Sequence, residues 1–232
     1  ENIWGKSGRR SATAGSFFRV NAATGTGKTV VMSLMGVDAA SRGHKVVIAV
    51  PGYVELDNTV KIMRQVASVV APKLKVAPLH SVSRTHQRAG VHFKLQNEDH
   101  PYDYACLLNA YASELEPMPA DNEPCFKLHV VTSKGNAKEE TQRLDHCPFL
   151  FSCGRTKMVA QALEADVIVI NHHALLSGTT RIPFDDSSQF PGPRSFIELL
   201  LRISPVFLVD EIDGLLKTAI DNSAFSLQLG NI

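Results

Sequence analysis

The chain has 232 residues, of which 44% are hydrophobic and 20% are charged, a composition typical of one globular domain or slightly more. Its formal net charge of +1 gives no overall field that would select nucleic acid or a membrane surface as partner. No apolar run approaches the roughly 20 residues of a membrane span, and no signal peptide is visible. We therefore expect no membrane association and a cytoplasmic location, or a nuclear one in a eukaryote.

Short apolar runs alternate with helix-favouring stretches along most of the chain. Strands are predicted at 17–21, 45–50, 74–79, 166–171 and 206–210, and helices at 29–40, 54–70, 156–164 and 195–202. Such alternation indicates βαβ units, in which helices sandwich a parallel sheet. We therefore predict an α/β fold.

The interval 95–153 breaks this alternation. It is polar and acidic, contains several prolines and offers no apolar run suited to a central strand. We predict that it is a small insertion subdomain hung on the sheet. Residues 1–94 and 154–232 are then the first and second parts of a single domain.

The segment 22–29 reads Ala-Ala-Thr-Gly-Thr-Gly-Lys-Thr and lies between a predicted strand and a predicted helix. Gly25 and Gly27 can take positive φ, which lets backbone N–H groups converge on phosphate oxygens at the helix start. Lys28 is expected to contact the β- and γ-phosphates of ATP, and the Thr29 hydroxyl to bind Mg²⁺. Strand, loop and helix in this order are the context that a phosphate-binding loop requires. The predicted nucleotide-binding residues are Ala22, Ala23, Thr24, Gly25, Thr26, Gly27, Lys28 and Thr29.

A second motif consists of two acids that follow the apolar run 206–209. That run suits a central parallel strand. Asp210 would hold Mg²⁺, usually through water, and Glu211 would orient and deprotonate the attacking water. With the loop upstream, these two acids predict the other half of an ATPase site, with Lys28 and Glu211 as its catalytic residues.

All four cysteines fall within the predicted insertion, at Cys106, Cys125, Cys147 and Cys153. Four thiolates in a small segment with little core indicate a structural metal or a cluster, because four Cys ligands suit either Zn²⁺ or [4Fe–4S]. Zinc sites usually show more closely spaced pairs, so the wide spacing favours the cluster. A mixed Cys/His zinc site and free thiols remain as alternatives, whereas disulfides are not expected beside a cytosolic ATPase motif.

These features resemble, in the same order, those of the XPD/DinG family, the iron–sulfur DNA helicases of superfamily 2. The loop 22–29 resembles the family's helicase motif I, and 47–51 resembles motif Ia. Tyr104-Ala-Cys106 and 147–153 resemble the cluster cysteines with their neighbours, and 165–176, ADVIVINHHALL, resembles the segment after the cluster domain. The residues 210–213 occupy the place of the family's DEAH motif.

The resemblance implies a RecA-like P-loop NTPase domain that uses ATP, Mg²⁺ and a [4Fe–4S] cluster. It implies an ATP-dependent helicase that moves 5′ to 3′ on single-stranded or forked DNA and is associated with the nucleoid in a bacterium. The family also has a second RecA-like domain with an arginine finger, which we do not recognise here, so the chain is expected to be an incomplete motor. Asp213 replaces the family's histidine, which couples the ATP site to DNA movement.

Candidate DNA contacts are Tyr53, Arg84, Arg88, His172 and His173. For the charged residues the alternative is a solvated surface, and for the two histidines it is a hydrogen-bonded pair that closes the edge of the sheet.

Two other functions compete with this interpretation. The sequence 210–213 also matches the Walker B strand of many AAA+ ATPases, but their loops usually carry Gly-Pro-Pro where this chain has Ala-Ala-Thr. A degenerate helicase fragment that only binds DNA or a partner is favoured by Asp213. It is opposed by the intact Lys28 and Glu211.

Overall fold

A four-stranded parallel sheet forms the centre of the protein in the computed structural model, which describes residues 19–21, 25–81, 129–133, 140–144, 154–180, 194–204 and 206–223. Its strands lie in the order β2-β5-β1-β8. Their bounds are Val46–Val50 for β1, Val76–Leu79 for β2, Val167–Asn171 for β5 and Val206–Val209 for β8. The two central strands, β1 and β5, are fully buried along their length, as continuous Val/Ile runs predict for strands covered on both faces.

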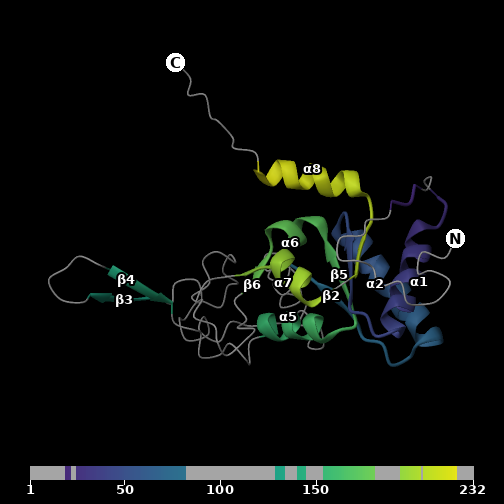
Figure 1. The fold of residues 1–232 in the computed structure, drawn as a ribbon, viewed down its shortest axis with the longest axis horizontal. Coiled ribbons are helices and arrows are strands. Elements are labelled where there is room, and N and C mark those ends of the chain that lie inside the picture. Colours follow the sequence, from purple (N-terminus) through teal and green to yellow (C-terminus); the bar gives the residue numbers. More distant parts are fainter. Residues whose placement is uncertain are drawn as a thin grey trace, which may run out of the picture.

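Helices cover both faces of this sheet (Figure 1). On one face lie α1 (Lys28–Ser41) and α2 (Tyr53–Val70). On the other lie α5 (Gly154–Glu164), α6 (His172–Ser177) and α7 (Phe196–Ile203). The last helix, α8 (Ile212–Ser223), follows β8 and contacts α6, and it has no buried residue.

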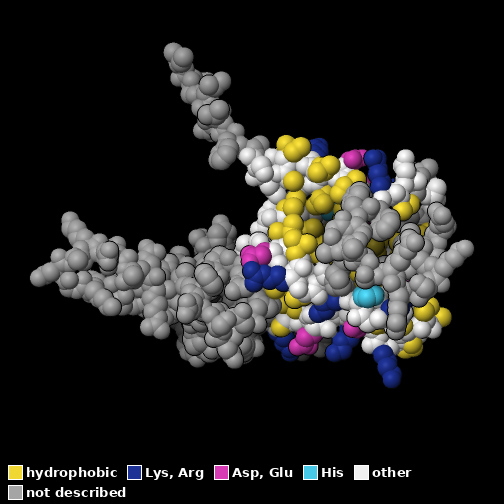
Figure 2. Space-filling model, in the orientation of Figure 1, with side chains coloured by type: hydrophobic (Ala, Val, Ile, Leu, Met, Phe, Trp, Pro, Cys, Tyr) yellow, Lys and Arg dark blue, Asp and Glu magenta, His cyan; other side chains and the backbone are white. Residues whose placement is uncertain are grey.

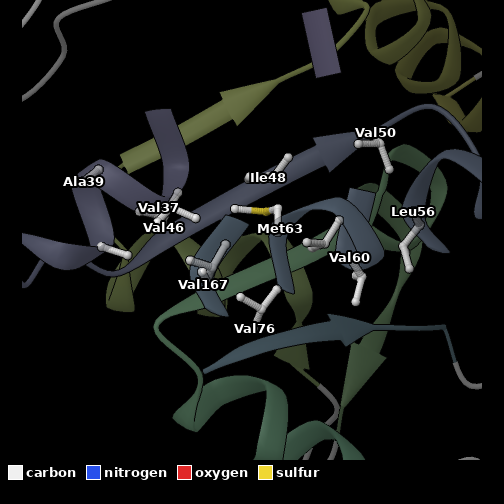
Figure 3. Packing of buried hydrophobic residues seen from close by; sticks show 13 residues of the cluster. Val37, Ala39, Val46, Ile48, Val50, Leu56, Val60, Met63, Val76 and Val167 are labelled. Carbon is white, nitrogen blue, oxygen red and sulfur yellow. The ribbon is translucent and has the colours of Figure 1, made fainter. Parts of the chain in front are cut away.

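The two faces of the sheet use alternate residues of each strand. Val46, Ile48 and Val50 of β1 pack with α1 and α2 around the buried Met63 (Figure 3). Val47 and Ala49 face the other way, toward the helices of the second layer. The side-chain period of two along a strand therefore divides the core into two clusters.

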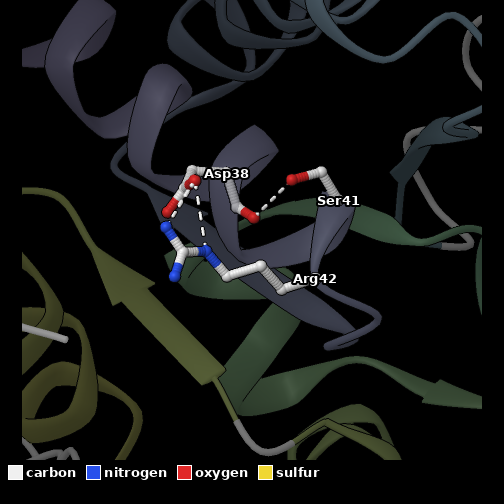
Figure 4. A network of polar contacts seen from close by, with 3 residues as sticks. All are labelled: Asp38, Ser41 and Arg42. Atoms are coloured by element: carbon white, nitrogen blue, oxygen red, sulfur yellow. Dashed lines mark hydrogen bonds and ion pairs between the residues drawn. The ribbon is translucent and has the colours of Figure 1, made fainter. Parts of the chain in front are cut away.

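Capping interactions fix where several helices begin and end. Asn171 accepts a hydrogen bond from the Ala174 N–H at 2.7 Å and starts α6. Ser195 starts α7 by accepting from the Glu198 N–H at 3.4 Å, which is half of a capping box. At the end of α1, Arg42 pairs with Asp38 at 3.0 Å, as Figure 4 shows.

Four of the five predicted strands and all four predicted helices are confirmed, with ends shifted by one or two residues. The predicted strand 17–21 is wrong for 19–21, which are exposed, with Val20 75% exposed, and belong to no strand; residues 17 and 18 lie outside the described residues. A strand is stabilised by a paired neighbour and by burial, and these three residues have neither. The helices α6 and α8 were not predicted.

Two small antiparallel pairs stand apart from the main sheet. Within 95–153, β3 (His129–Ser133) pairs with β4 (Glu140–Leu144) and with no strand of the main sheet. The second pair joins β6 (Thr179–Thr180) to β7 (Arg194–Ser195). Among the described residues, no helix is long and apolar enough to cross a membrane.

Candidate nucleotide site

The start of α1 and the two acids after β8 lie at the same edge of the sheet. All four strands are parallel, so their carboxyl ends meet at a single edge, where ligands of open α/β sheets bind. Asp210 and Glu211 follow β8 at this edge. A short turn, 42–45, joins the end of α1 to the start of β1, so α1 runs back along the sheet and begins at the same edge, at Lys28.

Two glycines before α1 have the positive φ that the sequence predicted. Gly25 has φ of 82° and Gly27 has φ of 76°, both in the left-handed region where an L side chain would be strained. The positive φ predicted for both glycines is confirmed. Residues 22–24, and with them Ala22, Ala23 and Thr24, lie outside the described residues.

The start of α1 presents backbone donors without a side-chain cap. Gly27 occupies the N-cap position, and its carbonyl accepts from the N–H groups of Val30 at 3.0 Å and Val31 at 3.1 Å. No acidic residue lies in the first turn. The first-turn N–H groups and the helix dipole therefore favour an anion at this end.

α1 packs closely against α2 and β1, and it also reaches β8, the strand that Asp210 follows. At Gly36, an added Cβ would lie 3.1 Å from the Ile48 side chain of β1 and 3.7 Å from the Leu208 side chain of β8. Lys28 and Thr29 are half-buried, and the Thr29 carbonyl accepts a hydrogen bond from Ser33 at 2.7 Å. The approach at Gly36 therefore places α1 over β1 and in contact with β8.

The two acids lie in a tightly held turn. The Asp210 N–H donates to the Ala49 carbonyl at 2.9 Å, and the Glu211 carbonyl accepts from the N–H groups of Gly214 at 2.8 Å and Leu215 at 3.2 Å. Glu211 has φ of 52° and is exposed. It is the one described non-glycine residue with positive φ, and such strain persists where surrounding contacts impose it, often at functional positions.

A buried histidine lies beneath this turn. His172 is 1% exposed, and a Cβ on Gly214 would lie 3.7 Å from its ring. Burial lowers the pKa of His172 below its usual value and favours the neutral ring. Hydrogen bonding to the Asp210 backbone and the carboxylates of Asp210 and Glu211 act in the opposite direction without overcoming burial.

The burial of His172 changes its interpretation as a DNA contact. A side chain that is 1% exposed cannot meet a strand at the surface, so the alternative of a histidine that closes the sheet edge fits His172 better. Its neighbour His173 is exposed and stays a candidate. The sequence offers little to distinguish the buried histidine from the exposed one, because both follow the same strand.

Tyr53 is also a candidate DNA contact within the described residues. The Tyr53 hydroxyl lies 2.9 Å from the Ser81 hydroxyl, and its ring stacks on His80 with centroids 6.1 Å apart. Arg84 and Arg88 lie outside the described residues. On the face in Figure 2, Lys and Arg side chains are scattered among acidic ones, and exposed apolar side chains gather near α8, whose Leu216 and Ile220 are exposed.

The predicted cluster ligands Cys106, Cys125, Cys147 and Cys153 all lie outside the described residues. Within the part of the chain that the structure describes, no group of three or more His, Cys, Asp or Glu side chains could hold a metal ion. The ligand prediction therefore stays a prediction.

Comparison with known proteins finds no matching family model and no match among curated proteins.

Proposed function

We propose that the protein binds and hydrolyses ATP and is the nucleotide-binding motor domain of a DNA helicase of the XPD/DinG type, with a RecA-like fold. The observation that supports this proposal is that two motifs occur at the same edge of the sheet. A glycine loop with positive φ opens α1 there, and Asp210 and Glu211 follow β8 there. Neither motif alone would support more than a turn or a strand that ends in acids.

The residues of this edge divide the work of hydrolysis. The amides from Gly25 to Thr29 and the Lys28 ammonium would hold the β- and γ-phosphates, and Thr29 and Asp210 would bind Mg²⁺. When bound, Mg²⁺ neutralises charge on the phosphates. Glu211 would accept a proton from the attacking water, which its exposed position allows.

Movement along DNA requires more than this domain. A translocating motor needs a cleft that opens and closes around ATP, with a charge from the opposite side to stabilise the transition state. We propose that a second RecA-like domain supplies that charge, and that single-stranded DNA binds across the carboxyl edge near Tyr53 and His173. Movement 5′ to 3′ is the direction that the resemblance implies.

Stimulation of ATP turnover by single-stranded DNA tests this function. Together with the proposed second domain, the protein is expected to hydrolyse ATP several-fold faster with single-stranded DNA than without it, whereas residues 1–232 alone are expected to turn over slowly and unwind nothing. Strand displacement on 5′-tailed and 3′-tailed duplexes measures direction. ATP turnover without any response to DNA would favour an AAA+-type ATPase, and no turnover at all would favour a fragment that only binds DNA or a partner.

We further propose that the four cysteines hold a [4Fe–4S] cluster. Protein purified without oxygen is expected to be brown and to contain about four iron atoms per chain. A matched comparison is the variant with Cys106 and Cys125 changed to Ser, which should lose the colour and the iron. One bound zinc in colourless protein would instead support the zinc site, and protein free of metal would leave the thiols without a ligand role.

A further inference from the structure

The backbone of Glu211 is strained, and the strain calls for a cause. Glu211 has φ of 52° and is the one described non-glycine residue with positive φ. Such a backbone persists only where surrounding contacts hold it, because an L side chain lowers its free energy by relaxing to negative φ. The planar peptide groups on either side of a residue define its φ and ψ. The hydrogen bonds of these two groups therefore decide whether the strain at Glu211 is kept.

The peptide group that follows Glu211 is held by the first turn of α8. The Glu211 carbonyl accepts from the N–H groups of Gly214 at 2.8 Å and Leu215 at 3.2 Å. These two bonds do not hold the peptide group that precedes Glu211, which carries the carbonyl of Asp210. That preceding group needs a donor from another part of the fold.

His172 supplies this donor. Its ring is 1% exposed and forms a hydrogen bond to the backbone of Asp210. The Asp210 N–H already donates to the Ala49 carbonyl at 2.9 Å, so the ring donates and the Asp210 carbonyl accepts. The donor is Nδ1, because Nε2 has no hydrogen-bond partner among the described residues and the Nδ1–Cε1 edge faces Gly214 of the turn. The Ala49 carbonyl also lies near the ring and acts on it less than Asp210 does.

We propose that His172 is a positioning residue that imposes the positive φ of Glu211, because its Nδ1–H holds the Asp210 carbonyl while the first turn of α8 holds the Glu211 carbonyl. With both flanking peptide groups fixed, the backbone of Glu211 cannot relax, and the direction of its side chain is set. No proton is transferred. The consequence for hydrolysis rests on the proposed function, in which Asp210 and Glu211 serve the metal and the attacking water.

The strain can be measured without any activity by comparing glycine with alanine at position 211. Both substitutions remove the carboxylate, and they differ in the cost of positive φ, which is small for glycine. In the wild-type background we expect Glu211→Gly to melt about 1–4 °C above Glu211→Ala. In the His172→Phe background the alanine variant should melt at the same or a higher temperature, because a relaxed backbone favours alanine. An equal preference for glycine in both backgrounds, or none in the wild type, would overturn the proposal.

Turnover tests whether the imposed geometry serves hydrolysis. His172→Phe removes the donor, His172→Asn keeps a side-chain N–H at about the reach of Nδ1, and His44→Phe changes an exposed histidine before β1. We expect kcat of His172→Phe to fall at least about 10-fold with KM for ATP within about threefold, because the orientation of Glu211 affects hydrolysis more than binding. His172→Asn should recover much of kcat, and His44→Phe should keep the wild-type value. Wild-type kcat in folded His172→Phe protein would overturn the positioning role.

The tautomer of His172 gives a test that needs no variant to fold. In wild-type protein labelled with ¹⁵N-histidine, the ring nitrogen shifts of His172 should show a proton on Nδ1 and none on Nε2. A proton on Nε2 alone would overturn the proposal, because Nδ1 would then have nothing to donate. If the tautomer and the preference for glycine are as expected but the wild type neither binds nor hydrolyses ATP, the proposed function fails and the inference about the backbone stands.

Discussion

Replacement of Lys28 by alanine is expected to lower ATP turnover at least about 100-fold, because it removes the side-chain charge that we propose binds the β- and γ-phosphates. Lys28 is the first residue of α1, directly after the left-handed Gly27. Alanine is a strong helix former, so α1 should keep its fold. Phosphate release at saturating Mg²⁺–ATP measures the effect, with the melting temperature as a check on folding.

The matched control is Lys157→Ala. Lys157 is exposed on α5, which covers the opposite face of the sheet from α1. The control removes the same charge from the same type of element, so it corrects for any general effect of net charge. Turnover by Lys28→Ala equal to that of Lys157→Ala would show that the loop is not the phosphate site.

The central sheet was predictable from sequence because its signals are local. The runs 46–50 and 167–170 are apolar throughout, and Pro51-Gly52 and Asn171 follow them directly, so burial on both faces follows from composition. The glycine loop was predictable for a similar reason, because a single backbone conformation explains both Gly25 and Gly27. Strand order, in contrast, depends on which strand edges pair and which helix faces pack on the sheet, and no local sequence pattern encodes it.

The strand order of the sheet also bears on the wrong prediction of a strand at 19–21. α1 and α2 cover the same face, and α2 connects β1 across β5 to β2. Because crossovers are right-handed, a strand that precedes α1 must lie on the other side of β1, beyond β8. The outer edge of β8 has no pairing partner among the described residues, and all four of its residues are half-buried. The apolar pattern at 17–20 was real, but no pairing follows from it alone.

The position of His172 could not be predicted for a different reason. Two adjacent histidines at a strand end differ only in the direction that each side chain takes, and the start of α6 sets that direction. Asn171 caps α6, after which His172 turns inward and His173 outward. The sequence contained both residues and gave no sign of which was buried. The positive φ of Glu211 was equally invisible, because glutamate does not favour it.

Replacement of Glu211 by glutamine is expected to leave nucleotide binding nearly intact and to lower hydrolysis about 100- to 10,000-fold, the range of a lost general base. Glutamine matches glutamate in shape, so the turn held by the Gly214 and Leu215 N–H groups should persist. Asp210 and Lys28 are unchanged, so the Mg²⁺–ATP complex keeps its proposed ligands. The affinity for a fluorescent ATP analogue and the rate of phosphate release measure the two effects separately.

Glu164→Gln serves as the control for this substitution. Glu164 is the exposed last residue of α5, which leads into the amino end of β5 and so lies at the edge of the sheet opposite the proposed site. The same loss of one carboxylate there should leave both binding and hydrolysis unchanged. The decisive comparison is with Lys28→Ala, which is expected to lose affinity as well as turnover. If Glu211→Gln loses affinity to the same extent as Lys28→Ala, then Glu211 helps to hold the nucleotide, and the assignment of the metal to Asp210 and of the water to Glu211 is wrong.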